Sequence, residues 1–222
     1  MGGSYPTVFL LDDEESVAVA LARMLRADGF AVRVWTSAVR FLSEHDAQAP
    51  GCLVSDVRMP EMDGLQLQRA LLERGVRRPI IFITGRGDIP TSVQAMKGGA
   101  VTFLVKPVQR AELYDAVSEA IARDAADRAD YRDSEEISRR LARLTPRERQ
   151  VLDLVMSGLL NKQIAAQLGA AEKTIKVHRG HIMEKMQVRT ATALVRLLSR
   201  RSQKQAEPFL RVVSSEKAAG AT

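Results

Sequence analysis

Three acids, one threonine and one lysine stand at the ends of apolar segments that lie far apart in the sequence. They are Asp12, Asp13, Asp56, Thr84 and Lys106. Taken singly, an acid in such a place is usually a turn residue or a helix cap. Gathered together, carboxylates repel each other unless a cation is present, and oxygen ligands of this kind suit Mg²⁺. A lysine and a hydroxyl opposite them would stabilise the oxygens of a phosphoryl group.

Five apolar segments alternate with helical patterns through the first half of the chain. The expected strands are 7–11, 31–35, 52–56, 79–84 and 102–105. Between them apolar residues recur at helical spacing, Gly29 ends the first helix and Asp88 caps the fourth. This alternation predicts an α/β fold, a doubly wound parallel (βα)5 sheet with right-handed crossovers.

The carboxyl ends of parallel strands lie along one edge of a sheet, where open α/β folds place their ligands. The five polar residues are therefore expected to meet in one pocket. The alternative is that they are five unrelated segment ends, two of them helix caps. That alternative is acceptable for any one of them, but their joint placement favours the pocket.

The joint spacing of these residues resembles the receiver domain of two-component response regulators. The resemblance covers residues 5–123 and rests on Asp12-Asp13, Asp56 with Met59-Pro60 and Asp63-Gly64, Thr84, and Phe103 before Lys106-Pro107. It implies that Asp56 accepts a phosphoryl group from a sensor histidine kinase. It further implies that Thr84 and Phe103 are switch residues and that Lys106 contacts phosphate. Mg²⁺ would be bound by Asp12, Asp13, Asp56 and the backbone carbonyl of Arg58.

The resemblance also implies what phosphorylation changes. The surface of the fourth helix and fifth strand is expected to pair two copies of the phosphorylated chain, through Val93, Met96, Lys97 and Leu104. The bond between Lys106 and Pro107 is expected to be cis, which proline permits. The chemistry is phosphoryl acceptance followed by slow self-hydrolysis, so the chain is not expected to be an enzyme.

Charged residues are divided unevenly along the 222-residue chain, whose net charge is +6. Residues 1–124 carry 14 Lys and Arg against 16 Asp and Glu, whereas residues 144–222 carry 14 against 6. A basic C-terminal part favours a polyanion as partner, although an idle basic surface gives the same count.

The composition places the chain among globular proteins, with 45% apolar and 27% charged residues. No window approaches the ~20 apolar residues of a membrane span, and the N-terminus shows no basic-then-apolar secretory pattern, so we expect a cytoplasmic protein with no membrane partner. The chain has one cysteine, Cys52, which lies inside an expected strand. A single cysteine excludes a disulfide framework.

Residues 124–143 are expected to form a helical linker that continues the fifth helix. They contain no glycine or proline, and their apolar residues are sparse and unevenly spaced. This pattern favours a solvated helix, with a dimeric coiled coil as the alternative.

The next part, residues 144–199, begins with a strong helix start. Thr145-Pro146-Arg147-Glu148 combines a threonine cap, a proline at the first helical position and a glutamate at the third. Gly158 ends this helix, Gly169 ends a second, and a third runs from about Glu172 to Met186. Helices joined through a short turn that contains glycine are typical of a helix-turn-helix, here within a four-helix, all-α domain.

The third of these helices has two faces at about 100° per residue. Ile175, Ile182 and Met186 cluster on one side, and Lys176 and Val177 project from the other. A valine beside lysines suits a surface on which lysines meet phosphates or guanine and valine meets a thymine methyl group. An ordinary basic amphipathic helix is the alternative.

Residues 144–199 resemble the LuxR-type DNA-binding domain, and the whole chain resembles the FixJ/NarL class of response regulators. The resemblance rests on 144–148, Gly158-Leu159, Asn161-Lys162, Ile164-Ala165, Leu168-Gly169 and 174–178. It implies double-stranded promoter DNA as partner, contacted through Lys162, Thr174, Lys176, Val177, Arg179, Gly180, His181 and Lys185. Of these, Lys162, Thr174 and Lys185 are expected nearer phosphates. Gly180 departs from the class, which often has a longer side chain there, so His181 or Arg179 would compensate.

The sequence therefore predicts a DNA-binding transcriptional regulator that dimerises when Asp56 is phosphorylated, with RNA polymerase as a further partner that this role allows. Residues 200–222 are expected to be a disordered tail. One alternative is a phosphorelay or scaffold component whose basic domain binds a protein. Another is a constitutive DNA binder with a vestigial receiver.

Overall fold

The computed structural model describes residues 5–85 and 95–199. The chain divides into two compact units, residues 1–129 and 130–222. The expected tail, 200–222, lies outside the described residues. Within the described ranges, no helix is both long enough and apolar enough to cross a bilayer.

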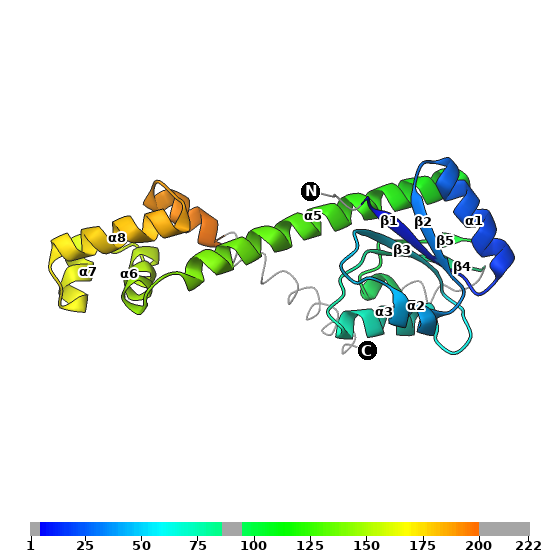
Figure 1. The fold of residues 1–222 in the computed structure, drawn as a ribbon, viewed down its shortest axis with the longest axis horizontal. Helices are drawn as coiled ribbons and strands as arrows, with labels where there is room; N and C mark the ends of the chain where they lie inside the picture. Colours follow the sequence, from blue (N-terminus) through cyan, green and yellow to red (C-terminus); the bar gives the residue numbers. More distant parts are fainter. Residues whose placement is uncertain (1–4, 86–94, 200–222) are drawn as a thin grey trace, which may run out of the picture. The chain divides into compact units, whose positions relative to one another are not determined.

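The first unit is built on a five-stranded parallel sheet (Figure 1). Its strands are β1 (Thr7–Leu11), β2 (Ala31–Trp35), β3 (Gly51–Asp56), β4 (Ile80–Thr84) and β5 (Thr102–Val105). The order β2-β1-β3-β4-β5 places β1, β3 and β4 inside the sheet. All six residues of β3 and all five of β4 are buried, as expected of strands covered on both faces. The predicted α/β fold is confirmed.

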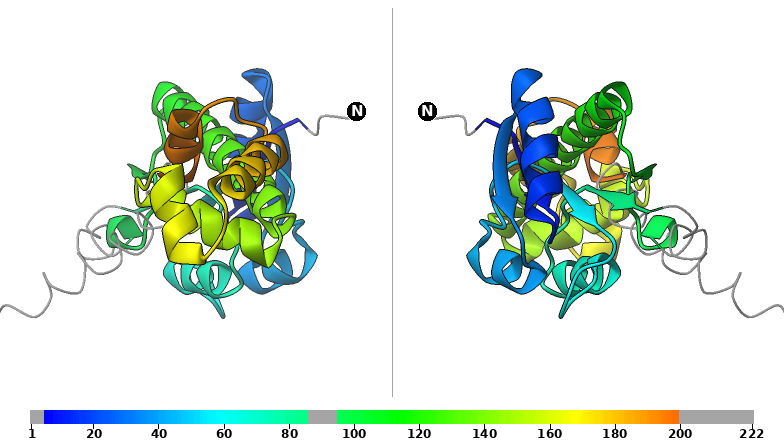
Figure 2. Two further views of the ribbon diagram at one scale, coloured as in Figure 1. Left: turned by 90° about the vertical axis from the view of Figure 1, so that its left-hand side faces the viewer. Right: turned by 90° about the vertical axis from the view of Figure 1, so that its right-hand side faces the viewer.

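Helices cover both faces of this sheet (Figures 1 and 2). On one face, α2 (Ala38–Glu44) and α3 (Gly64–Glu73) enclose a core with Phe9, Leu53 and Phe82. On the other face, α1 (Glu15–Ala27) and the first part of α5 (Arg110–Ala142) enclose the core that contains the alternate strand residues. Successive side chains of each strand point to opposite faces of the sheet, so each face has its own apolar core.

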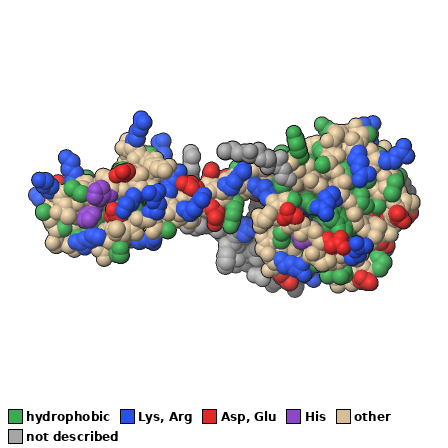
Figure 3. Space-filling model, in the orientation of Figure 1, with side chains coloured by type: hydrophobic (Ala, Val, Ile, Leu, Met, Phe, Trp, Pro, Cys, Tyr) green, Lys and Arg blue, Asp and Glu red, His purple; other side chains and the backbone are tan. Residues whose placement is uncertain are grey.

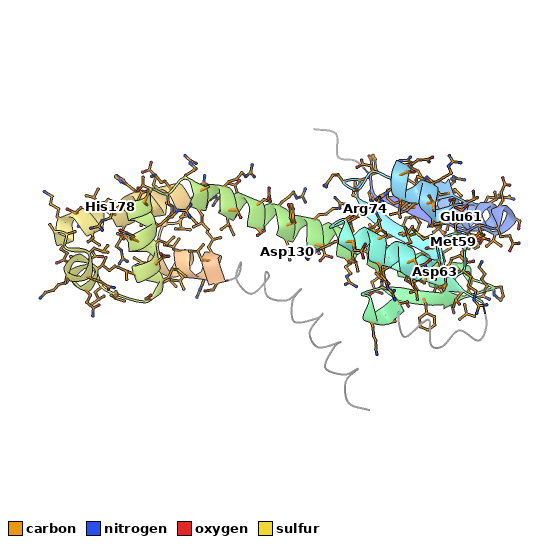
Figure 4. All side chains as sticks on the ribbon, turned by 90° about the horizontal axis from the view of Figure 1, so that it is seen from below. Met59, Glu61, Asp63, Arg74, Asp130 and His178 are labelled. Carbon is orange, nitrogen blue, oxygen red and sulfur yellow. The ribbon has the colours of Figure 1, made fainter. Side chains whose placement is uncertain are left out.

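The loop from β3 to α3 is held close to the end of β3. Met59, Glu61 and Asp63, labelled in Figure 4, lie in this loop. Asp63 caps α3 by accepting a hydrogen bond from the Gln66 backbone, and the Gln66 side chain accepts one from the Asp63 backbone. At Gly64 a Cβ atom would lie 2.6 Å from the backbone oxygen of Asp56. Glycine therefore permits α3 to begin against the strand end.

The fourth helix is described only at its end. Residues 95–97 are helical, whereas Asp88 and Val93, which are predicted to cap this helix and to lie on its surface, fall outside the described residues. Ala95 and Ala100 are buried in the core under α3, and Gln68 of α3 donates to the carbonyl oxygen of Gly98 at 3.1 Å. The described end of this segment is thus fastened to α3.

Helix α5 continues through the expected linker as far as Ala142, but the linker is buried near both ends. Asp124 is buried in the first unit and accepts a hydrogen bond from the Gly51 backbone nitrogen at 2.8 Å. Ile137 is buried in the second unit, where Leu141 and Leu144 pack against or within the same core. These three are spaced four and three residues apart, which is a helical stripe. Tyr131, between the two ends, is exposed as expected.

The second unit is helical, which confirms the all-α prediction for this part of the chain. It contains α6 (Pro146–Met156), α7 (Asn161–Leu168), α8 (Glu172–Met186) and a further helical segment at 191–199. The expected capping box is present, since Thr145 accepts from the Glu148 backbone and Glu148 accepts from the Thr145 backbone. Gly169 ends α7 in the left-handed conformation.

Candidate functional site

The expected pocket forms at the carboxyl edge of the sheet. Asp56 is the last residue of β3, Thr84 is the last residue of β4, and Asp12 and Lys106 directly follow β1 and β5. Strand pairing joins these ends, because Asp56 is in register with Ile83, and the Lys106 backbone nitrogen donates to the Thr84 carbonyl oxygen at 2.8 Å. The parallel sheet thereby brings residues from four distant segments to one place.

The three acids of the pocket lie close together. One carboxylate oxygen each from Asp12, Asp13 and Asp56 lies within 4.8 Å of the others. Asp12 is fully buried and Asp56 is 8% exposed, whereas Asp13 is exposed to solvent. Three carboxylates in this arrangement fit a divalent cation that takes oxygen ligands and retains some water.

Lys106 bridges two of these acids. Its Nζ lies 2.9 Å from Asp12 Oδ2 and 2.5 Å from Asp56 Oδ2. The second oxygen of each acid accepts from a backbone nitrogen, that of Glu14 for Asp12 at 3.0 Å and that of Arg58 for Asp56 at 3.1 Å. Both carboxylates are therefore held in fixed orientations, and one cation offsets part of their negative charge.

The electrostatics of the pocket follow from burial and from this bridge. Burial raises the pKa of Asp12 above its usual range, although Lys106 and the Glu14 backbone act in the opposite direction. Burial acts to lower the pKa of Lys106, but its hydrogen bonds to Asp56 and Asp12 outweigh that effect and raise it. Lys106 therefore remains a cation at neutral pH.

The two expected switch residues occupy different environments. Thr84 is buried, and its Oγ1 donates to the carbonyl oxygen of Gly85 at 3.2 Å. Phe103 is 40% exposed, and its backbone is in register with Phe82 of β4. The peptide bond between Lys106 and Pro107 is cis, as expected.

Leu104 cannot form part of a docking surface, which corrects the prediction. It is buried in the core beneath α1 and α5, together with Leu113 and Val117. Side chains alternate along a strand, so the neighbours of Leu104, Phe103 and Val105, are the ones that face outward. Both are exposed, at 40% and 42%. The alternation rule, applied to the right phase, would have found Val105.

Two other members of the expected docking surface are exposed, unlike Leu104. Met96 is 44% exposed and Lys97 is exposed, as a surface role requires. Val93 lies outside the described residues. Gln68, which holds the end of this segment through Gly98, was missed because nothing in the sequence pairs residues 30 positions apart.

The outward face of α8 carries most of the residues expected to meet DNA. Val177 is 49% exposed, and Thr174, Lys176 and Gly180 are exposed, whereas Ile175, Ile182 and Met186 form the buried side. Arg179 is half-buried, and so is His178, which Figure 4 labels on this helix. Lys162, near the start of α7, is exposed. On the face seen in Figure 3, Lys and Arg side chains are spread over the second unit with few acids among them.

Lys185, which is expected near phosphate, is held differently from the other cations of α8. Its Nζ lies 2.7 Å from Oε2 of Glu148, a buried residue of α6. His181 also approaches this acid, with Nδ1 3.7 Å from Oε1. The sequence indicated Glu148 only as a helix cap, because its partner lies 37 positions away.

Comparison with known proteins agrees with this geometry. Residues 8–118 match the family described as response regulator receiver domain, and residues 142–198 match the family of bacterial regulatory proteins, luxR family. The chain is a response regulator. It belongs to the FixJ/NarL class, in which a receiver is joined to a LuxR-type DNA-binding domain, and it is a phosphorylation-dependent transcriptional regulator of a two-component system.

Relatives and solved structures cover nearly the whole response regulator. The response regulator protein TodT of Pseudomonas putida is 44% identical over 193 residues, which are 87% of this chain and 85% of TodT. Transcriptional regulatory protein FixJ of Rhizobium meliloti is 44% identical over 191 residues, 86% of this chain and 94% of FixJ. The structure of response regulator StyR has a TM-score of 0.80 at 44% identity, covering 88% of this chain and 99% of StyR.

Proposed function

We propose that Asp56 accepts a phosphoryl group from the phosphohistidine of a sensor kinase. The observation that carries this proposal is the bridge of Lys106 between Asp12 and Asp56, with Asp13 beside them. A carboxylate oxygen of Asp56 attacks phosphorus, the bond from phosphorus to the histidine nitrogen breaks, and the imidazole leaves with that electron pair. The product is an acyl phosphate on Asp56.

The charges of the pocket support this transfer. A bound Mg²⁺ would be held by Asp12, Asp13, Asp56 and the backbone carbonyl of Arg58, and it supplies charge neutralisation for the phosphoryl oxygens. Lys106 already lies within hydrogen-bond distance of Asp56 Oδ2. Formation of the acyl phosphate removes the carboxylate charge, so Lys106 turns to the phosphoryl oxygens, where the new negative charge resides.

The same event would be read by Thr84 and Phe103. The Thr84 hydroxyl donates to the neighbouring Gly85 carbonyl in this structure, so it exchanges that acceptor for a charged phosphoryl oxygen. Its movement leaves room into which the exposed Phe103 turns. The surface formed by Met96, Lys97 and the outward side of β5 then pairs two copies of the chain.

Paired chains bind double-stranded promoter DNA through α8. Lys176 and Val177 face outward on this helix and would reach base edges in the major groove, while Lys162 and Thr174, which are also exposed, would contact phosphates. Arg179, Gly180 and His181 would add contacts at the flank of this face. Phosphoryl acceptance is stoichiometric, so we do not propose turnover of a separate substrate. Contact with RNA polymerase stays a prediction.

Phosphorylation of the full-length chain tests the first step. Acetyl phosphate with Mg²⁺ should produce a slower band on a phosphate-affinity gel, and Asp56→Asn should show none. An equal shift in both proteins would refute Asp56 as the acceptor. In a second experiment, duplexes selected from a random-sequence pool should bind the phosphorylated chain more tightly than the unphosphorylated one. Equal affinity would indicate a receiver that does not control DNA binding.

A further inference from the structure

Glu148 is a buried acid that contacts both α6 and α8. Its side chain is 4% exposed, and Oε2 accepts from the Thr145 backbone nitrogen at 2.8 Å and from Lys185 Nζ at 2.7 Å. On its other oxygen, His181 Nδ1 approaches to 3.7 Å. Two residues one turn apart on α8 thus point at one carboxylate of α6.

A carboxylate buried in this way is stable only with hydrogen-bonding partners. The hydrogen bond from Lys185 is the largest of the effects that lower the pKa of Glu148 below its usual range. Loss of Lys185 would therefore leave a buried charge with its capping bond alone, and α6 and α8 would lose the charged link between them.

The position of Lys185 around α8 separates it from Lys176. Lys176 and Lys185 are nine residues apart, and at about 100° per residue they point about 180° away from each other. Lys176 is exposed, whereas the Lys185 side chain is 30% exposed and directed at Glu148. The Glu148 carboxylate therefore holds the Lys185 ammonium on the side of α8 away from Lys176.

We infer that Glu148 and Lys185 are positioning residues for DNA recognition, and that Lys185 does not contact phosphate. Their ion pair fixes the rotation of α8 about its own axis, so that Lys176 and Val177 face outward. The inference rests on the proposed function, in which this face of α8 meets DNA. Apolar contacts of Ile175, Ile182 and Met186 hold α8 against the core, and the ion pair adds a directional contact that apolar packing lacks.

Salt dependence distinguishes a positioning residue from a phosphate contact. Removing one lysine that contacts phosphate reduces the slope of log K against log salt concentration by about 0.9. The full-length chain, treated with acetyl phosphate and Mg²⁺, is used to select duplexes from a random-sequence pool. Affinities for the selected duplex are then measured over a range of salt for wild type, Lys185→Met and the matched control Lys162→Met.

We expect Lys185→Met to bind about tenfold more weakly with an unchanged slope, and Lys162→Met to show a slope smaller by about 0.9. Lys185→Arg keeps the charge and should restore affinity. In the Glu148→Gln/Lys185→Met double variant, glutamine keeps the capping bond and no charge is left unpaired. Its affinity loss should therefore be smaller than the two single losses combined.

Three results would overturn the inference. They are a slope reduced by about 0.9 in Lys185→Met, an affinity unchanged by that substitution, and additive losses in the double variant. If Lys185→Met is too unstable to assay, the salt slope of the double variant replaces it, because that variant also lacks Lys185 and should keep the wild-type slope. A wild-type chain that selects no duplex would instead overturn the proposed function, and this inference with it.

Discussion

Replacing Asp12 with asparagine is expected to stabilise the first unit at neutral pH while weakening Mg²⁺ binding. Asp12 is fully buried, and its charge faces two other carboxylates as well as Lys106. We expect this because the charge of Asp12 destabilises the folded chain without a cation and stabilises it only when a cation is bound.

The magnitude follows from opposing terms. At an effective dielectric constant of about 20, carboxylates within 4.8 Å repel by about 3.5 kcal/mol or more, and the Asp12–Lys106 pair at 2.9 Å attracts by about 6 kcal/mol. Asp13 adds a repulsion that solvent weakens, because Asp13 is exposed. The pairwise terms leave a net attraction of at most about 2.5 kcal/mol, and the lost hydration of a fully buried carboxylate, several kcal/mol, exceeds it and decides the sign. Asparagine keeps one of the two hydrogen bonds, and we expect a net gain of about 1 kcal/mol.

The effect depends on pH with a defined sign. The folded-state pKa of Asp12 is raised, so the folded wild-type chain binds this proton more tightly than the unfolded chain does. The contribution of Asp12 to stability is fully present below the unfolded value and is lost as pH rises through the folded pKa. The advantage of Asp12→Asn is therefore largest at pH 7 and disappears below the ordinary value of 3.8.

Urea unfolding followed by tryptophan fluorescence measures this effect in the first unit alone. Trp35 is the one tryptophan of the chain and is buried in that unit. With EDTA present, Asp12→Asn should unfold at higher urea than wild type. With Mg²⁺ at 100 times the dissociation constant of the wild type, wild type gains about 2.7 kcal/mol and the order reverses. Asp13→Asn is the matched control, since it removes an exposed acid and should change stability much less in EDTA.

A lower urea midpoint for Asp12→Asn in EDTA would refute the reasoning, because it would mean that the bridge to Lys106 outweighs burial. Equal gains for Asp12→Asn and Asp13→Asn would show that net charge, and not burial, determines the effect.

Three further substitutions have defined outcomes. Leu104→Ala should destabilise the first unit by about 2–4 kcal/mol, because it leaves a cavity in the core, and urea unfolding followed by Trp35 fluorescence measures this loss. If the variant kept the wild-type urea midpoint but no longer dimerised, Leu104 would be a surface residue and not a core residue. Gly98→Ala should also destabilise this unit, since a Cβ there would overlap Oε1 of Gln68. Adding Gln68→Ala should reverse part of that loss, and additive losses would count against the clash. The pKa of Glu148 is lowered, so its contribution to stability is present above the ordinary value of 4.5 and is lost as pH falls through the folded pKa. Circular dichroism of the thermal transition of the second unit should show this loss in wild type but not in Glu148→Gln, and parallel pH curves would contradict it.

The pocket could be predicted from sequence because backbone rules determine it. Each of Asp12, Asp56, Thr84 and Lys106 stands at the end of an apolar run, and parallel strands bring such ends to one edge. No side-chain packing has to be known for that inference. The bridge of Lys106 to both acids is a matter of side-chain geometry, and the sequence indicated only its neighbourhood.

The errors arise where packing or distant pairing decides. The resemblance to receiver domains places Leu104 on the surface, whereas the alternation of side chains along β5 turns it toward the core. Lys185 looks like one more cation of a basic helix, because its partner Glu148 is fixed only when α6 and α8 pack together. Ile137 and Leu141 look isolated in the sequence because the core that they join lies outside α5.

The hydrogen bond from Gly51 to Asp124 determines where the chain can be cut. Gly51 begins β3, the strand that ends in Asp56, and its buried N–H has Asp124 of α5 as its acceptor. Arg128 completes the contact by donating to Asp124 and to the carbonyl oxygens of Gln48 and Ala49. An isolated receiver that stops at residue 118 or 123 would leave this N–H without a protein partner, at a cost of about 1–3 kcal/mol. A fragment that ends after Ala129 keeps the whole contact and should be the better boundary for kinase and phosphate-lifetime measurements on a shortened chain.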